Sequence, residues 1–151
     1  MRRAREETEN NQVELHSMKT VLTFGVYDML HIGHMLLFER ARKLGDKLVV
    51  AVQDESQVLK YKPDTRMIYT TEERVYMVDS IKSVDKVVVY KDVDTDIQEI
   101  EFDILVIGED QRHEGFQRAV KWCEYNGKEV VTLTRTEGKS STILRLYSKS
   151  K

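Results

Sequence analysis

The sequence predicts an α/β protein with a doubly wound, mainly parallel sheet of five strands and helices on both faces. From residue 19 onward, short apolar and β-branched runs alternate with segments of helical periodicity, which is the order expected of right-handed βαβ units. The apolar runs are nearly continuous, which is typical of strands that helices cover on both sides. These two observations predict the fold class.

Each element is expected from its own local pattern. Strands are expected over residues 20–24, 47–52, 86–90, 104–107 and 129–133. Helices are expected over residues 33–44, 71–83, 94–100, 115–126 and 141–147, and a short helix could open the segment 54–66. Thr70 and Glu73 have the spacing of a capping box, and Gly45 and Gly127 lie where helix C-terminal caps are expected.

Length and composition indicate one globular domain. The 151-residue chain can bury a core, and we expect a charged extension over residues 1–18 followed by a single domain over residues 19–151. The formal net charge of −2 gives no reason to expect a nucleic acid or a membrane as a partner, and no run approaches the roughly eighteen apolar residues of a membrane span. Cys123 is the only cysteine, so no internal disulfide can form and a reducing, cytoplasmic compartment fits. It lies on an apolar helical stripe and is expected in the core.

The segment between the first strand and the first helix is the first candidate for a binding site. The strand ends near Gly25, and helical periodicity places His31 and His34 at the first turn of the next helix, on one face. Free backbone N–H groups and the positive end of the helix dipole attract anions there. The dipole disfavours an added cation, so neutral imidazoles could donate N–H to phosphate oxygens. Gly33 leaves room for a ligand to come close, and this edge of a doubly wound sheet is where ligands bind.

Two other interpretations of the histidine pair remain open at this stage. The side chains could be hydrogen-bonded polar residues with no special role. Together with Asp28 they could instead ligate a metal ion, although the chain offers few other ligands.

The loop after the second strand supplies a cluster of cations. Lys60, Lys62 and Arg66 lie within seven residues of one another, as in segments that cover a polyphosphate, although a solvated loop of mixed charge would have the same composition. Arg74 follows in the next helix beside two glutamates. An exposed salt bridge is its simplest interpretation, and such pairs contribute little.

The loops after the fourth and fifth strands also carry polar groups. Gly108 permits a sharp turn, and the acidic residues after it, including Asp110, could orient a sugar hydroxyl or a base edge; ordinary turn chemistry explains them about as well. The hydroxyl-bearing residues 140–142 precede a helical pattern and could form an N-cap and a second anion site. Arg135 would add a planar donor fork suited to phosphate oxygens.

Two motifs far apart in the chain resemble those of a known family. His31-Ile32-Gly33-His34 matches the HxGH motif of the nucleotidyltransferase superfamily. Residues 135–142, Arg-Thr-Glu-Gly-Lys-Ser-Ser-Thr, are similar to the RTEGISTT-type motif of the CTP-dependent cytidylyltransferases. Gly25-x-Tyr27-Asp28 and Glu72-Glu73-Arg74 match as well. From about residue 20 to 147 the chain resembles the small bacterial glycerol-3-phosphate cytidylyltransferases.

The resemblance implies a Rossmann-like nucleotidyltransferase domain that transfers CMP from CTP to a small phosphate monoester and releases pyrophosphate. The acceptor would be glycerol 3-phosphate or a related polyol or amino-alcohol phosphate, with Mg²⁺ as cofactor and a homodimer as the assembly. Lys82 and Gln111 replace the arginine and the tryptophan that the glycerol-3-phosphate enzymes tend to have, which leaves the acceptor open. An adenylyltransferase using ATP and a non-catalytic nucleotide-binding regulatory module are the alternatives.

The resemblance also implies roles for individual residues. The catalytic residues would be His31, His34, Lys60 and Arg135. The nucleotide would be bound by Phe24, Gly25, Val26, Asp28, Gly33, Lys62, Arg74, Gly108, Asp110, Thr136, Glu137, Gly138, Ser140, Ser141 and Thr142. Asp28 is also the candidate metal ligand, with the orientation of a histidine as its alternative role.

Overall fold

The structure is a computed structural model that describes residues 18–134. The expected N-terminal extension lies almost entirely outside these residues, and so does the expected helix over residues 141–147. Residues 135–142, the late motif, also lie outside the described residues. They include the candidates Arg135, Thr136, Glu137, Gly138, Ser140, Ser141 and Thr142.

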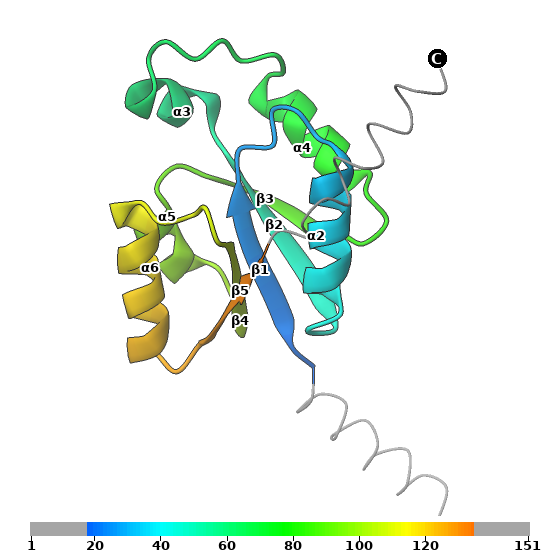
Figure 1. Cartoon of the computed structure of the whole chain (residues 1–151), viewed down its shortest axis with the longest axis vertical. Helices are drawn as coiled ribbons and strands as arrows, with labels where there is room; N and C mark the ends of the chain where they lie inside the picture. Colours follow the sequence, from blue (N-terminus) through cyan, green and yellow to red (C-terminus); the bar gives the residue numbers. More distant parts are fainter. Residues whose placement is uncertain (1–17, 135–151) are drawn as a thin grey trace, which may run out of the picture.

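One five-stranded sheet with the strand order β3-β2-β1-β4-β5 forms the centre of the molecule (Figure 1). The strands are β1 (Thr20–Gly25), β2 (Lys47–Gln53), β3 (Lys86–Tyr90), β4 (Ile104–Gly108) and β5 (Glu129–Leu133). Every neighbouring pair is parallel. The predicted doubly wound sheet is therefore confirmed, and its described strands are all parallel.

Helices cover both faces of the sheet. The elements are α2 (Ile32–Arg42), α3 (Glu55–Tyr61), α4 (Thr71–Asp79), α5 (Val93–Asp96), the 3₁₀ turn η1 (Ile97–Glu99) and α6 (Glu114–Tyr125). Figure 1 shows α2 and α4 on one face, α5 and α6 on the other, and α3 beyond the carboxyl ends of the strands. No helix in the described part of the chain is long and apolar enough to cross a membrane.

The core is divided by the sheet into two apolar clusters. Phe38 of α2 and Val78 of α4 are fully buried on one face, and Phe116 and Cys123 of α6 are buried on the other. The prediction that Cys123 is a core residue is confirmed, since the side chain is 0% exposed. Burial raises the pKa of its thiol to about 11, which leaves the group protonated and unreactive at neutral pH.

The capping box before α4 and the glycine after α6 are confirmed. Thr70 and Glu73 exchange side-chain-to-backbone hydrogen bonds of 3.1 and 3.0 Å. Gly127 has a φ of 69°, and the N–H of Lys128 donates to the carbonyl of Cys123 at 2.8 Å. This is a Schellman ending, in which glycine accepts the left-handed backbone without strain.

Three helix boundaries differ from the prediction for local reasons. The expected cap at Gly45 is wrong, because α2 ends with Lys43 as its C-cap. The helix α4 ends at Asp79, where the hydroxyl of Ser80 donates to the carbonyl of Tyr76 at 2.8 Å, a bond that competes with helix continuation. The helix expected over residues 94–100 begins at residue 93 and tightens into the 3₁₀ turn η1.

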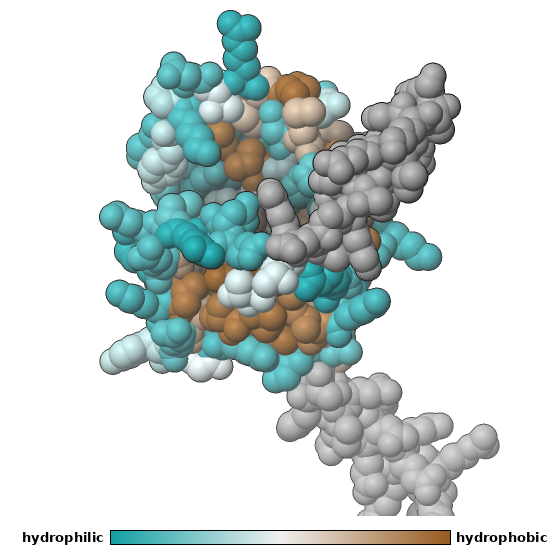
Figure 2. Space-filling view, viewed as in Figure 1, coloured by the Kyte–Doolittle hydropathy of each residue, from teal (hydrophilic) through white to brown (hydrophobic). Residues whose placement is uncertain are grey.

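Strand β5 is an edge strand with partly buried side chains. Val131 and Leu133 pack against the cluster beneath α2 and α4, and Val130 packs against the other. Figure 2 shows apolar side chains gathered on the front face between α6 and α2, where this edge of the sheet lies.

Candidate active site

The site lies where strands β1 and β4 separate. β1 pairs with β2 along its whole length, up to Gly25↔Val52. Its pairing with β4 ends earlier, at Thr23↔Val106. The strand order reverses at this point, and ligands of α/β sheets bind beyond the strand ends at such a reversal. Phe24, next to the carboxyl end of β1, is buried.

The side chain of Gln111 bridges the two diverging strands. Its Nε2 donates to the Phe24 carbonyl at 2.7 Å, and its Oε1 accepts from the Gly108 N–H at 2.9 Å. The candidates Gly108 and Asp110 lie in this turn, with Asp110 exposed. Sequence reasoning noticed Gln111 only as a departure from the family. Its bridge spans 87 positions, so no local pattern could have found it.

The loop after β1 is folded over its own strand by Tyr27. This residue has a φ of 57°, an uncommon conformation for a residue with a side chain. A Cβ on Gly25 would overlap the Tyr27 ring, so only glycine allows the ring to lie there. The ring contacts His34 and Phe38 edge-on, with centroids 5.6 and 5.3 Å away, and thereby supports the His34 imidazole from the core side.

The two histidines are brought together and cap helix α2. His31 is the N-cap residue, and its Nδ1 accepts from the Gly33 N–H at 3.0 Å. The Nδ1 of His34 accepts from the His31 N–H at 3.1 Å. The ring centroids are 4.0 Å apart. The expectation that free N–H groups of the first turn face an anion is therefore wrong for His31 and Gly33, because imidazole nitrogens occupy both.

This capping arrangement determines which nitrogen of each ring can donate. A ring whose Nδ1 accepts a hydrogen bond carries its proton on Nε2. The capped helix start therefore presents two adjacent Nε2–H donors in place of the backbone amides. Burial and the neighbouring His31 lower the pKa of His34 to about 4, so this imidazole is neutral at pH 7.

The low pKa of His34 predicts a loss of stability in mild acid. Between pH 6.5 and about 4, the unfolded chain binds a proton at this residue and the folded chain does not. The contribution of His34 to the free energy of unfolding is therefore complete above pH 6.5 and is lost as the pH falls to about 4. Urea unfolding should show that the difference in unfolding free energy between the unsubstituted protein and His34→Asn shrinks across this window. A constant difference would contradict the shifted pKa.

Asp28 connects two loops at the edge of the site. Its Oδ2 accepts from the Ile68 N–H and its Oδ1 from the Tyr69 N–H, each at 2.9 Å. In this structure the carboxylate therefore holds the segment before α4 and does not orient a histidine. The described residues contain no group of three or more His, Cys, Asp or Glu side chains that could hold a metal ion. The described part of the chain thus does not supply a protein cage for Mg²⁺.

Arg74 is fully buried, with 0% of its surface exposed, so the interpretation as a surface salt bridge is wrong. Its guanidinium donates to the carbonyls of Val26 at 2.8 Å, Gln53 at 2.7 Å and Tyr69 at 3.3 Å, and to the Thr71 hydroxyl at 3.2 Å. Protein oxygens thus accept from four of its five N–H groups, and these bonds fix the loop that carries the histidines against β2 and α4. The expected contact of Arg74 with the nucleotide stays a prediction.

The structure confirms the expected short helix as α3, and the expected cations lie exposed on it and in the loop after it. Lys60 is in its last turn and Lys62 is its C-cap, and Arg66 follows in the loop. None of the ion pairs between described residues involves these three side chains.

The chain leaves β5 beside the histidine helix. Arg40 of α2 donates to the carbonyl of Thr134, the last described residue, at 2.7 Å. Since β5 is parallel to the other strands, its carboxyl end lies at the same edge as that of β1. The late motif therefore begins, in sequence, immediately after a residue that contacts α2.

The Rossmann-like parallel sheet and the histidine-capped first helix define the fold and site of a nucleotidyltransferase. The chain matches the family model of cytidylyltransferase-like proteins over residues 22–146. It belongs to this family. The chain is thus a member of a nucleotidyltransferase family, whose enzymes transfer a nucleotidyl group to an acceptor.

Individual relatives agree with this assignment. The chain is 39% identical over 138 residues to a glycerol-3-phosphate cytidylyltransferase of Staphylococcus aureus, covering 87% of this chain and 98% of that protein. It is 38% identical over 128 residues to a bifunctional protein HldE of Cronobacter sakazakii, covering 82% of this chain but only 26% of that protein.

Solved structures show the same fold. A lipopolysaccharide core biosynthesis protein from Thermoplasma volcanium superposes with a TM-score of 0.68 at 26% identity, covering 80% of this chain and 99% of that one. Pantothenate synthetase from Thermus thermophilus superposes with a TM-score of 0.54 at 16% identity, covering 78% of this chain and 56% of that one. The second similarity concerns the fold alone.

Proposed function

We propose that the protein transfers the CMP group of CTP to a small phosphate monoester, glycerol 3-phosphate or a related polyol or amino-alcohol phosphate, and releases pyrophosphate. The observation that carries the proposal is the pair of imidazoles with Nδ1 engaged by the backbone and Nε2–H left to donate. The glycerol-3-phosphate cytidylyltransferase that aligns along most of the chain supports the choice of CTP and of this acceptor class.

The chemistry needs charge neutralisation more than a base. A phosphate monoester has a second pKa near about 6, so it is largely a dianion at neutral pH. One of its oxygens attacks the α-phosphorus of CTP, and the bond from that phosphorus to the bridging oxygen of the β-phosphate breaks. Pyrophosphate leaves with the electron pair. The protein must therefore align two anions that repel each other and stabilise the charge on the leaving group.

The described side chains can be given roles in this reaction. His31 and His34 would donate to oxygens of the α- and β-phosphates, and Lys60 and Lys62 would neutralise the triphosphate. Mg²⁺ would be held mainly by phosphate oxygens, as it commonly is in nucleotide sites. From the late motif, the hydroxyls of residues 140–142 would bind the β- and γ-phosphates, and Arg135 would contact a phosphate or the base. The contact between Arg40 and Thr134 supports this assignment, because it places the residue just before the motif beside α2. We also propose that the protein assembles as a homodimer.

A matrix of substrates tests the proposal. CTP, ATP, GTP and UTP are each combined with a panel of phosphate monoesters and Mg²⁺, and pyrophosphate is measured. We expect turnover with CTP and a polyol or amino-alcohol phosphate. Turnover with ATP alone would establish the adenylyltransferase alternative. Nucleotide binding without pyrophosphate from any pair would indicate the regulatory module.

A further inference from the structure

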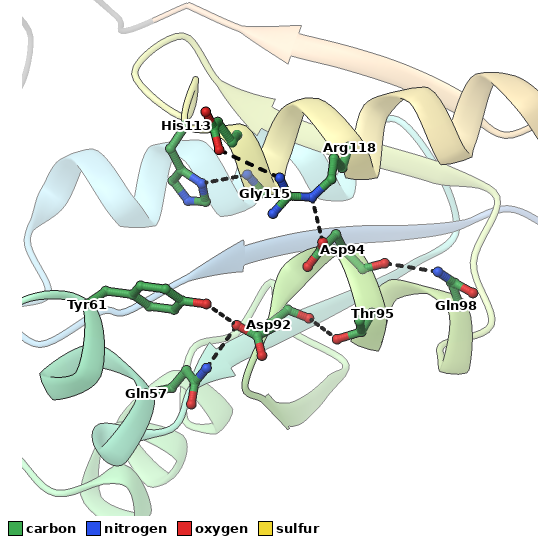
Figure 3. Close-up of polar contacts among 10 residues, drawn as sticks. Gln57, Tyr61, Asp92, Asp94, Thr95, Gln98, His113, Gly115 and Arg118 are labelled. Carbon is green, nitrogen blue, oxygen red and sulfur yellow. Dashed lines mark hydrogen bonds and ion pairs between the residues drawn. The ribbon is translucent and has the colours of Figure 1, made fainter.

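Asp92 holds a neighbouring helix instead of its own. It occupies the N-cap position of α5, yet its side chain makes no capping bond there, although aspartate is a preferred N-cap residue. Its Oδ1 accepts instead from the Tyr61 hydroxyl at 2.6 Å and from the Gln57 amide at 2.9 Å, both from α3. Figure 3 shows these two side chains converging on the carboxylate.

Helix α3 needs such an anchor. It has seven residues and buries only Gln57 and Val58, and an isolated helix of this length is not stable in water. Asp54 caps its first turn. The other end depends on Tyr61, which lies four residues after Gln57 and therefore on the same helical face. The bond to Asp92 thus fixes the end of α3 that leads into the loop with Lys62 and Arg66.

The turn that carries Asp92 is itself fixed to the core. Val93 is 4% exposed and packs in the same cluster as Phe116 of α6. Asp94 accepts from the Arg118 Nε of α6 at 2.7 Å, as Figure 3 also shows. Asp92 is therefore the rigid partner, and α3 is the element whose position it determines.

Tyr61 lies between the two lysines of the proposed site. The Lys60 ammonium lies 5.9 Å from the centre of the Tyr61 ring, within the range of a cation–π contact. The Lys62 N–H closes the helix by donating to the Val58 carbonyl at 2.8 Å. The Tyr61 ring therefore contacts one lysine directly, and a shift of the end of α3 would move both lysines.

The electrostatics keep this contact in one protonation state. The Tyr61 hydroxyl holds the pKa of Asp92 below its ordinary value, and the carboxylate raises the pKa of Tyr61. The proton therefore stays on the tyrosine at neutral pH, so the bond is a charge-assisted one from a neutral phenol to a carboxylate.

We propose that Tyr61 and Asp92 are positioning residues whose hydrogen bond holds α3 where Lys60 and Lys62 reach the triphosphate. The inference rests on the proposed function, because it assigns the contact to substrate binding in that reaction. Neither side chain touches the reacting atoms, so the effect of losing the bond should fall on nucleotide binding and not on the chemical step.

Steady-state pyrophosphate release with CTP as the varied substrate tests the proposal. Tyr61→Phe removes only the hydroxyl and is expected to raise KM for CTP about three- to tenfold, the value of one such bond, with kcat within about twofold. Asp92→Ala should do the same, and Asp92→Asn, which keeps an acceptor oxygen, should restore most of the affinity. Tyr125→Phe, at a 94% exposed position of α6, is the matched control and should change neither constant.

A merely structural role would give a different pattern. In a Lys60→Ala, Lys62→Ala background, we expect Tyr61→Phe to leave kcat/KM unchanged, because the groups it positions are absent. An unchanged KM in Tyr61→Phe, a loss confined to kcat, or an equal loss in the lysine-free background would each overturn the proposal. Absence of turnover in the unsubstituted protein would instead overturn the proposed function.

Discussion

Replacement of His34 by alanine is expected to lower kcat by about a hundred- to a thousand-fold, the usual cost of removing one donor to charge that develops in the transition state. The Nδ1 of His34 accepts from the His31 N–H, so Nε2–H is the group left to donate to the phosphates. A bond that strengthens only in the transition state affects kcat more than ground-state binding. KM for the triphosphate should therefore change much less than kcat, as pyrophosphate release kinetics will measure.

Two further variants separate the chemistry of His34 from its capping role. His34→Ala also removes half of the capping box, which costs about 0.5–2 kcal/mol of stability. His34→Asn retains an acceptor near the position of Nδ1 but has no donor near that of Nε2, so it should be the more stable variant with equally low turnover. Glu39→Ala, at an exposed position of α2, should keep full activity.

The single cysteine provides a check that these variants are folded. Cys123 is buried, so a thiol reagent should label it only when the chain unfolds. Near-full turnover in a His34 variant with a protected thiol would exclude the imidazole from the reaction. Slow turnover with a protected thiol would assign the loss to the missing donor.

Features set by neighbouring residues in the chain were predictable from sequence. The apolar runs located all five strands to within one residue, since a buried parallel strand needs a continuous apolar segment. The capping box at Thr70 and the glycine ending at residue 127 depend on residues three to five positions apart. The family motif pointed to His31 and His34 as a pair, and the structure places their rings together.

Features set by contacts between distant segments were not predictable. The sequence predicts a surface position for Arg74 because glutamates adjoin it in the chain, whereas its bond to Val26 spans 48 positions. Asp28 lies 40 positions from the amide of Ile68 that it accepts from. Asp92 has the sequence signature of a helix cap and holds a different helix. Hydrophobic periodicity carries no information on such polar contacts, which only the folded chain creates.

Replacement of Arg74 by alanine is expected to lower the free energy of unfolding by about 3–5 kcal/mol, as when one partner is removed from a buried charged network. The guanidinium is the donor for the carbonyls of Val26, Gln53 and Tyr69. Without it, these partly buried bonds are lost, and a buried polar group left without a partner costs about 1–3 kcal/mol. Since natural domains are stable by only about 5–15 kcal/mol, urea unfolding followed by circular dichroism will detect the loss readily.

Conservative replacements identify the property of Arg74 that matters. Arg74→Lys keeps the charge, but one ammonium cannot reproduce the planar fork, so most of the loss should remain. Arg74→Met keeps much of the volume and none of the donors, and it should be about as unstable as the alanine variant. Arg66→Ala removes an exposed arginine of the neighbouring loop and should change stability by less than about 0.5 kcal/mol.

The outcome for Arg74→Met decides between hydrogen bonding and packing. If this variant were as stable as the unsubstituted protein, the aliphatic part of the side chain would be the important one, and the carbonyls would have found other partners. If it is unstable, the arginine is required because it alone satisfies acceptors from three segments at once. One of those segments, at Val26, leads directly into the histidine-capped helix, so the folded fraction of Arg74→Lys should also show a lower kcat/KM, with the reacting groups all present but less firmly aligned.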